Sequence, residues 1–163
     1  MSAYANVTRT NLGTQGRDNI YNLIYTTITD PVNNTTSSSR TWIYKRFPNT
    51  KAVGFQNYPF IVLSYPSMEV EDKCLSHFKF LQFNIPGTIY CRFDYNGKIR
   101  ANTLINSLIA QVNLKANQDT LESYGVKAVD VEIDESSTEV HEKQEVIATP
   151  FTINFDVDID VEQ

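Results

Sequence analysis

Carboxylates stand at every second position in two segments of the sequence, and this spacing places them in a row on one face of a β-strand. The two rows are Asp130, Glu132 and Asp134, and Asp156, Asp158, Asp160 and Glu162. Because a strand rises about 3.3 Å per residue, neighbouring carboxylates in a row lie about 6.5–7 Å apart. These rows are the first candidates for a functional surface.

Three interpretations of the carboxylate rows are open. A solvated charged face would keep sheet edges from aggregating. A contact surface would meet a basic subunit, or repel DNA that slides past it. A Ca²⁺ or Mg²⁺ site is the third interpretation, although the sequence lacks the glycine-containing ligand loop typical of such sites. If the two strands pair, we expect like charges to face each other, which destabilises a sheet unless a cation or basic partner intervenes.

Other groups that carry catalysis form no recognised arrangement. The two histidines, His77 and His141, do not stand at a metal-binding spacing, and we expect His141 at the surface of a charged connection. Cys91 falls on the apolar side of an alternating segment, where a buried, inert thiol is usual. The six glycines build neither a phosphate-binding loop nor a nucleophile elbow. We therefore predict no enzyme activity, no cofactor and no metal site.

Basic residues interleaved with aromatic ones form a second candidate surface. The basic residues are Arg40, Lys45, Arg46 and Lys51, and the aromatic ones are Trp42, Tyr44 and Phe47. Such a segment can bind single-stranded nucleic acid, because bases stack on exposed rings. The alternative is an amphipathic strand whose charged side chains face water.

The net charge of −5 conceals a strong asymmetry along the chain. Residues 1–110 carry a balance of +5, whereas residues 111–163 carry −10. This distribution is compatible with self-association of opposite surfaces, with nucleic acid near one side, or with solubility alone.

The elements that must position these residues follow from hydrophobic periodicity. Helices are predicted from Asp18 to Pro31, over Lys98–Ala116 after the Asn96-Gly97 turn, and over Asp119–Tyr124. Strands are predicted within 42–47, 58–65, 77–85, 89–95, 129–133 and 145–161, with a break at Pro86-Gly87 and a bend or interruption at Pro150. The apolar residues of the last strand alternate with polar ones and should face the core: Phe151, Ile153, Phe155, Val157, Ile159 and Val161.

This order predicts an α+β fold in which two main helices pack on one face of an antiparallel sheet of four or five strands. Residues 1–16 are predicted to be a flexible N-terminal arm, and residues 17–163 a single α+β domain. The segment Thr29–Arg40 is predicted to be an extended loop. No apolar run reaches the roughly 18 residues that span a membrane.

The order of elements resembles that of tail terminator and related neck proteins of long-tailed viruses. The matching stretches are Ile20–Ile28, YPFIVLSYPSMEVED (58–72), FDYNGKIRANTLINSLIAQV (93–112), LESYGVKAVDVEID (121–134) and FTINFDVDIDV (151–161). They cover about residues 17–161, and the likeness is one of layout.

The resemblance implies a ring, hexameric in that family, that terminates the tail tube and joins it to the head-proximal connector in the virion. It implies contacts with other copies of the chain, with the tail tube protein and with head-tail connector proteins, and assembly in the host cytoplasm. Viral double-stranded DNA would pass through the ring without specific binding, and no catalytic residue or membrane is implied. The alternatives are a head-completion adaptor of the same neck, a divalent-metal-dependent enzyme, or a nucleic-acid-binding module.

Overall fold

The computed structural model describes residues 18, 20–22, 25, 42–49, 51, 58–64, 67–69, 74–75, 78–93, 96–123, 126–141 and 143–160. For residues 67–69, 74–75, 78–81, 123, 127–128 and 157–160 the description covers the backbone alone. The predicted arm (1–16) and the predicted loop (Thr29–Arg40) lie outside the described residues.

Helices and strands in the described residues follow the order expected of an α+β fold. The helices are α2 (Gly97–Asn113) and α3 (Lys115–Ser123). The strands are β1 (Ile43–Tyr44), β2 (Phe60–Leu63), β3 (Ser67–Glu69), β4 (Cys74–Leu75), β5 (Phe78–Arg92), β6 (Val126–Ile133), β7 (Ser137–His141) and β8 (Gln144–Asp160). Residues 18, 20–22 and 25 are also helical, within the segment where a first helix is predicted. The predicted fold class is confirmed.

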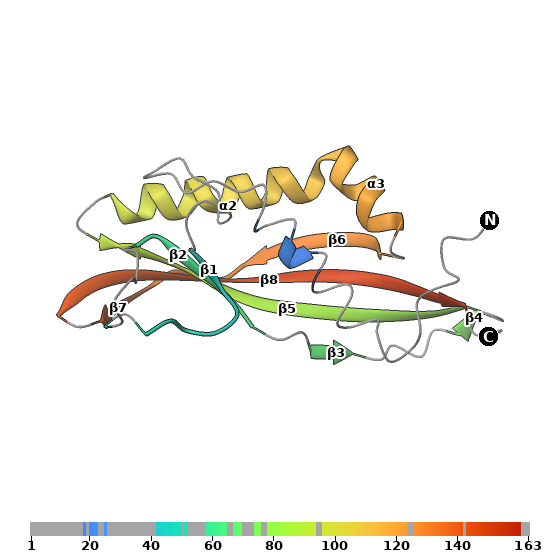
Figure 1. Ribbon diagram of the computed structural model, residues 1–163, viewed down its shortest axis with the longest axis horizontal. Coiled ribbons are helices and arrows are strands. Elements are labelled where there is room, and N and C mark those ends of the chain that lie inside the picture. Colours follow the sequence, from blue (N-terminus) through green and yellow to red (C-terminus); the bar gives the residue numbers. More distant parts are fainter. Residues whose placement is uncertain are drawn as a thin grey trace.

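The described strands form one sheet with the path β1-β2-β5-β8-β6, and α2 and α3 lie over one of its faces (Figure 1). The short strands β3 and β4 pair with β5, and β7 pairs with β8. The pairing is antiparallel except at one edge, where β1 runs parallel to β2. The prediction of a wholly antiparallel sheet differs at this edge. A parallel pair needs a crossover of about a dozen residues or more, and residues 45–59 supply it.

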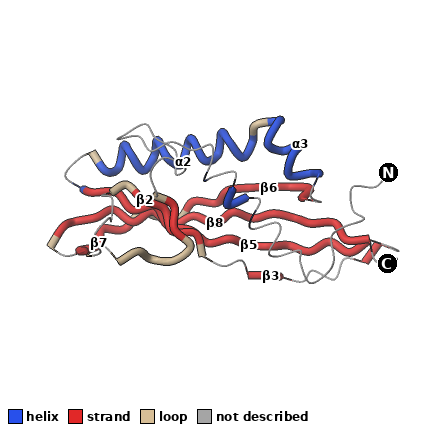
Figure 2. The backbone as a smooth tube through the Cα atoms, viewed as in Figure 1, coloured by secondary structure: helices blue, strands red, loops and turns tan. Residues whose placement is uncertain are grey.

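The long strands β5 and β8 pair along their whole shared length and form the spine of the sheet (Figure 2). Both pass through a proline without interruption. The predicted break at Pro86-Gly87 is therefore wrong, and of the two alternatives at Pro150 the interruption is excluded. The carbonyl of Pro86 accepts a hydrogen bond from the Ser64 amide (2.8 Å), and that of Pro150 from the Asp134 amide (3.0 Å). In an antiparallel sheet the N and the C=O of one residue point toward the same neighbouring strand. The position of the missing N–H therefore faces Ser64, after β2, at Pro86 and Asp134, after β6, at Pro150, and not the β5–β8 ladder. The central ladder therefore loses no hydrogen bond.

Gly87 is needed because an aromatic ring occupies the space above it. A Cβ at this position would lie 2.4 Å from Cζ of Phe151, its partner on β8. The Phe151 side chain is buried in the core, so the ring has little room to move away.

The core lies between the sheet and α2. Phe83, Ile85 and Ile89 of β5 and Phe151, Ile153 and Phe155 of β8 alternate toward it, and Ala101, Leu104, Ile105 and Leu108 of α2 face them. The rings of Phe83 and Phe155 stack with centroids 5.3 Å apart. The predicted alternation in the last strand is thus confirmed for its described side chains. Burial of this kind contributes roughly 1.5–3 kcal/mol for each large apolar side chain.

Helix α2 begins where the sequence predicts. Asn96 adopts a left-handed conformation (φ 55°, ψ 40°) and Gly97 is the first helical residue. A Cβ on Gly97 would lie 2.3 Å from the carbonyl oxygen of Arg92, so the turn from β5 into α2 requires glycine there.

Candidate interaction surfaces

The two carboxylate rows occupy neighbouring strands, as expected, but like charges do not face each other. In the β6–β8 register Asp130 is opposite Asn154, Glu132 is opposite Thr152, and Asp156 is opposite Ala128. The expectation of facing like charges is therefore wrong. A register shift between Val126 and Ala128 belongs to this pairing, and the charges of one strand meet neutral residues of the other.

The described carboxylates of both rows lie on the sheet face opposite the helices. Asp130 and Glu132 are exposed and Asp156 is partly exposed, whereas their strand neighbours on the other face pack toward the core. Asp134 follows β6 and is also exposed. The backbones of Asp158 and Asp160 pair with Phe80 and Phe78; their side chains, and Glu162 as a whole, lie outside the description.

The basic candidates lie at the other side of the sheet, directly after β1. Lys45, Arg46 and Lys51 are exposed, and Arg40 lies outside the described residues. The Lys45 ammonium is 4.0 Å from the Asp18 carboxylate and 5.1 Å from the centroid of the Tyr21 ring. Exposed pairs of this kind contribute little to stability, so Lys45 stays available to a partner.

Among the aromatic residues of this segment Trp42 is buried, whereas Tyr44 and Phe47 stay partly exposed and pack on neighbouring rings. Trp42 is fully buried, and Tyr44 meets the ring of Phe60 edge-on at 5.9 Å. Phe47, which is 47% exposed, packs against Phe60 and Tyr90 at 5.7 and 5.3 Å. A stacking platform for nucleic-acid bases needs free ring faces, and this arrangement favours the interpretation as a strand with charged residues in water.

A hydrogen-bonded chain joins distant parts of the sequence beside these rings. The Tyr58 hydroxyl lies 3.3 Å from Nδ1 of His141, and Nε2 of His141 lies 2.7 Å from Oε2 of Glu139. The His141 ring also contacts Phe47 and Tyr90. We expected His141 at the surface, but its side chain is only 18% exposed. The alternation of Glu139 and His141 on β7 was the one local signal that they share a face.

Tyr90, which contacts the His141 ring, and Cys91, which lies in the core, both have raised pKa values. Burial, followed by the nearby Glu139 carboxylate, raises the pKa of Tyr90 above 10.0, and a hydrogen bond with Thr88 opposes the shift. Burial raises the pKa of the Cys91 thiol from 9.0 to about 12, opposed by Arg100. A thiol with so high a pKa is a poor nucleophile at neutral pH, in line with the inert role predicted for Cys91.

The described residues offer no assembled cation site. No three His, Cys, Asp or Glu side chains among them are grouped closely enough to hold a metal ion. Two hollows are lined entirely by described residues. One, of about 420 Å³, lies between α3 and β6 beside Leu121 and Val129.

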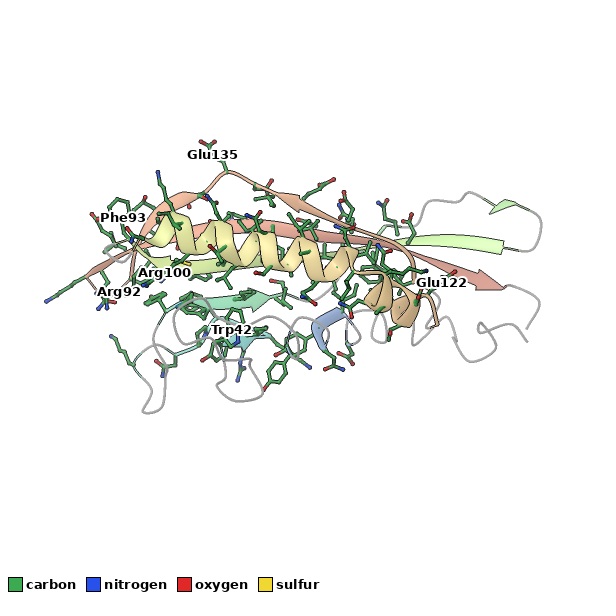
Figure 3. The ribbon with its side chains drawn as sticks, turned by 90° about the horizontal axis from the view of Figure 1, so that it is seen from above. Trp42, Arg92, Phe93, Arg100, Glu122 and Glu135 are labelled. Carbon is green, nitrogen blue, oxygen red and sulfur yellow. The ribbon has the colours of Figure 1, made fainter. Side chains whose placement is uncertain are left out.

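The acidic and basic candidates lie at opposite edges of the same sheet. β1 begins the strand path and β6 ends it. Figure 3 shows the two sides: Trp42, just before β1, and Glu135, just after β6, lie on opposite sides of α2. The Lys45–Arg46 segment and the Glu132–Asp134 segment therefore face away from each other.

No family model and no curated protein matches this sequence. Among the described helices, none combines the length and the apolar character needed to cross a membrane.

Proposed function

We propose that the chain is a structural subunit of a homo-oligomeric ring, without catalytic activity, in the neck or tail of a long-tailed virus. The observation that carries the proposal is the placement of opposite charges at opposite edges of one sheet. A closed ring requires two different surfaces on each subunit that fit each other head to tail. Charge complementarity then steers association and suppresses wrong contacts.

The exposed acidic face of the sheet supports a role around DNA. Asp130 and Asp156 lie on the face that the helices leave open. Phosphates are repelled by carboxylates, so a ring with this face toward its opening would let double-stranded DNA pass without holding it. The tail tube protein and the head-tail connector proteins would contact the two rims of such a ring. The resemblance in layout supplies this viral context.

The assembly state tests the proposal. Size-exclusion chromatography with light scattering should give one species at several times the 18.6 kDa of a single chain, about six times for a hexamer, and electron microscopy should show an annulus. Higher salt should weaken assembly, because it screens exposed charges. A strictly monomeric protein at millimolar concentration would refute the ring.

Charge reversal at the acidic edge makes the test specific. Glu132→Lys should raise the concentration needed for assembly about tenfold or more, since like charges then meet across the contact. Asp119→Lys on α3 is the matched control, because it makes the same change in charge at an exposed position outside the Glu132–Asp134 segment. Equal effects of the two variants would show that net charge alone governs assembly. Portal and tail-tube genes beside the coding sequence would support the viral context.

A further inference from the structure

We infer that, in the proposed ring, the Glu132–Asp134 segment of one copy binds the Lys45–Arg46 segment of the next copy. The inference rests on the proposed function and names the residues that form its contact. The hydrogen-bonded register of the sheet gives the position of each edge residue along the strand direction.

A single line of paired residues crosses the sheet from edge to edge. Tyr44 pairs with Val62, Val62 with Thr88, and Thr88 with Pro150. The carbonyl of Pro150 accepts a hydrogen bond from the Asp134 amide. The last residue of β1 and the first residue after β6 therefore stand level at opposite edges.

Both charged segments adjoin this line. Lys45 and Arg46 form a bend directly after Tyr44, so the basic segment begins at the level of the line. Asp134 stands on the line, and Ile133 and Glu132 precede it along β6. The two cations thus follow a residue that is level with Asp134.

This equal height bears on how copies associate. Head-to-tail contacts close into a ring when each copy is rotated without a shift along the ring axis, and they give a helical filament when such a shift accumulates. Two complementary segments at the same height allow neighbouring copies to meet edge to edge without that shift. Ile133, 43% exposed, lies between Glu132 and Asp134 in the sequence and adds an apolar side chain to this edge on the other face of the sheet.

Disulfide cross-linking tests the contact directly. Arg46→Cys and Glu132→Cys are introduced together into the full chain, with Cys74 replaced by serine, while Cys91 is buried and stays as it is. The two edges are four strand spacings apart, about 19 Å at 4.8 Å each, whereas a disulfide needs Cα atoms within about 7 Å. A bond between the two positions can therefore form only between copies.

Oxidation should yield a ladder of covalent multimers that ends at the ring size, and each single variant should yield none. The matched control combines Glu132→Cys with Lys98→Cys, because Lys98 and Arg100 also flank an exposed apolar residue, Ile99, on α2. This control should give no ladder. The swapped variant Arg46→Glu/Glu132→Arg should assemble like the wild type, although each single reversal does not.

The outcomes separate this inference from the proposed function. Rings by light scattering without cross-links at Arg46, or with equal cross-links at Lys98, would overturn the contact and leave the ring in place. Monomers at all concentrations would refute both.

Discussion

Gly87→Ala should destabilise the protein, although most glycine-to-alanine changes inside a strand stabilise by about 0.5–1 kcal/mol. The new Cβ would lie 2.4, 2.8 and 2.9 Å from Cζ, Cε2 and Cε1 of Phe151. Carbon atoms pack best about 3.5–4.0 Å apart, so the ring must move by about 1 Å or more. Phe151 is 1% exposed and close-packed. Overpacking costs about 1–3 kcal/mol, and contacts this short belong at the upper end, so after the glycine-to-alanine gain we expect a net loss of about 2 kcal/mol.

Urea denaturation followed by circular dichroism measures this loss. For a chain of 163 residues, 2 kcal/mol corresponds to a Tm lower by about 4–8 °C. Phe151→Leu is the second arm of a double-mutant cycle, because it removes the ring edge that the new methyl group meets. The double variant should lose about 1–2 kcal/mol less than the sum of the single variants. Additivity within about 0.5 kcal/mol, or a Gly87→Ala variant as stable as wild type, would refute the packing argument.

Three further predictions concern the core and the buried titratable groups. Leu108→Ala, at a fully buried position on α2, should lower the free energy of unfolding by about 2–5 kcal/mol. Ile99→Ala, at a position 66% exposed on the same helix, should change it by less than about 0.5 kcal/mol. Equal losses of the two variants in urea titrations would show that the buried face of α2 is misassigned. The pKa of Cys91 is about 12 in the folded state against an ordinary value of 9.0, so its contribution to stability is full below pH 9 and is lost as pH rises from 9 to 12. The fall in the free energy of unfolding over this range should be shallower in Cys91→Ala. Identical slopes of stability against pH in variant and wild type would contradict the raised pKa. Glu139→Gln should lower the pKa of Tyr90, since it removes one cause of the upward shift, while burial still raises that pKa. Ultraviolet difference titration of the variant against wild type measures the change. An unchanged titration curve would argue against an electrostatic effect of Glu139 on Tyr90.

Local sequence patterns predicted the elements well where side-chain period and turn chemistry agree. The alternation from Phe151 to Phe155 gave the buried face of β8, and Asn96-Gly97 gave the start of α2. Both signals are local: a strand has a period of two, and the left-handed turn needs Asn or Gly.

The register and the edges of the sheet could not be read from the sequence. The strands predicted on either side of Pro86-Gly87 are one strand, because the proline's missing N–H faces Ser64. The offset that separates the two carboxylate rows belongs to an irregular pairing between Val126 and Ala128. The contact of Tyr58 with His141 spans 83 residues, and no local pattern encodes such a distance.

The long ladder between β5 and β8 also has a consequence for folding. Its paired residues are 54 positions apart at one end, Arg92 with Val146, and 82 apart at the other, Phe78 with Asp160. Pairings at such separations give a high contact order, which slows folding because loop closure must precede the contacts that stabilise it. During synthesis, β5 leaves the ribosome well before its partner, and the edge that pairs with β8 stays unpaired until β8 follows. The spine of the fold is thus also its slowest step to assemble, and chaperone dependence during expression is the expected outcome.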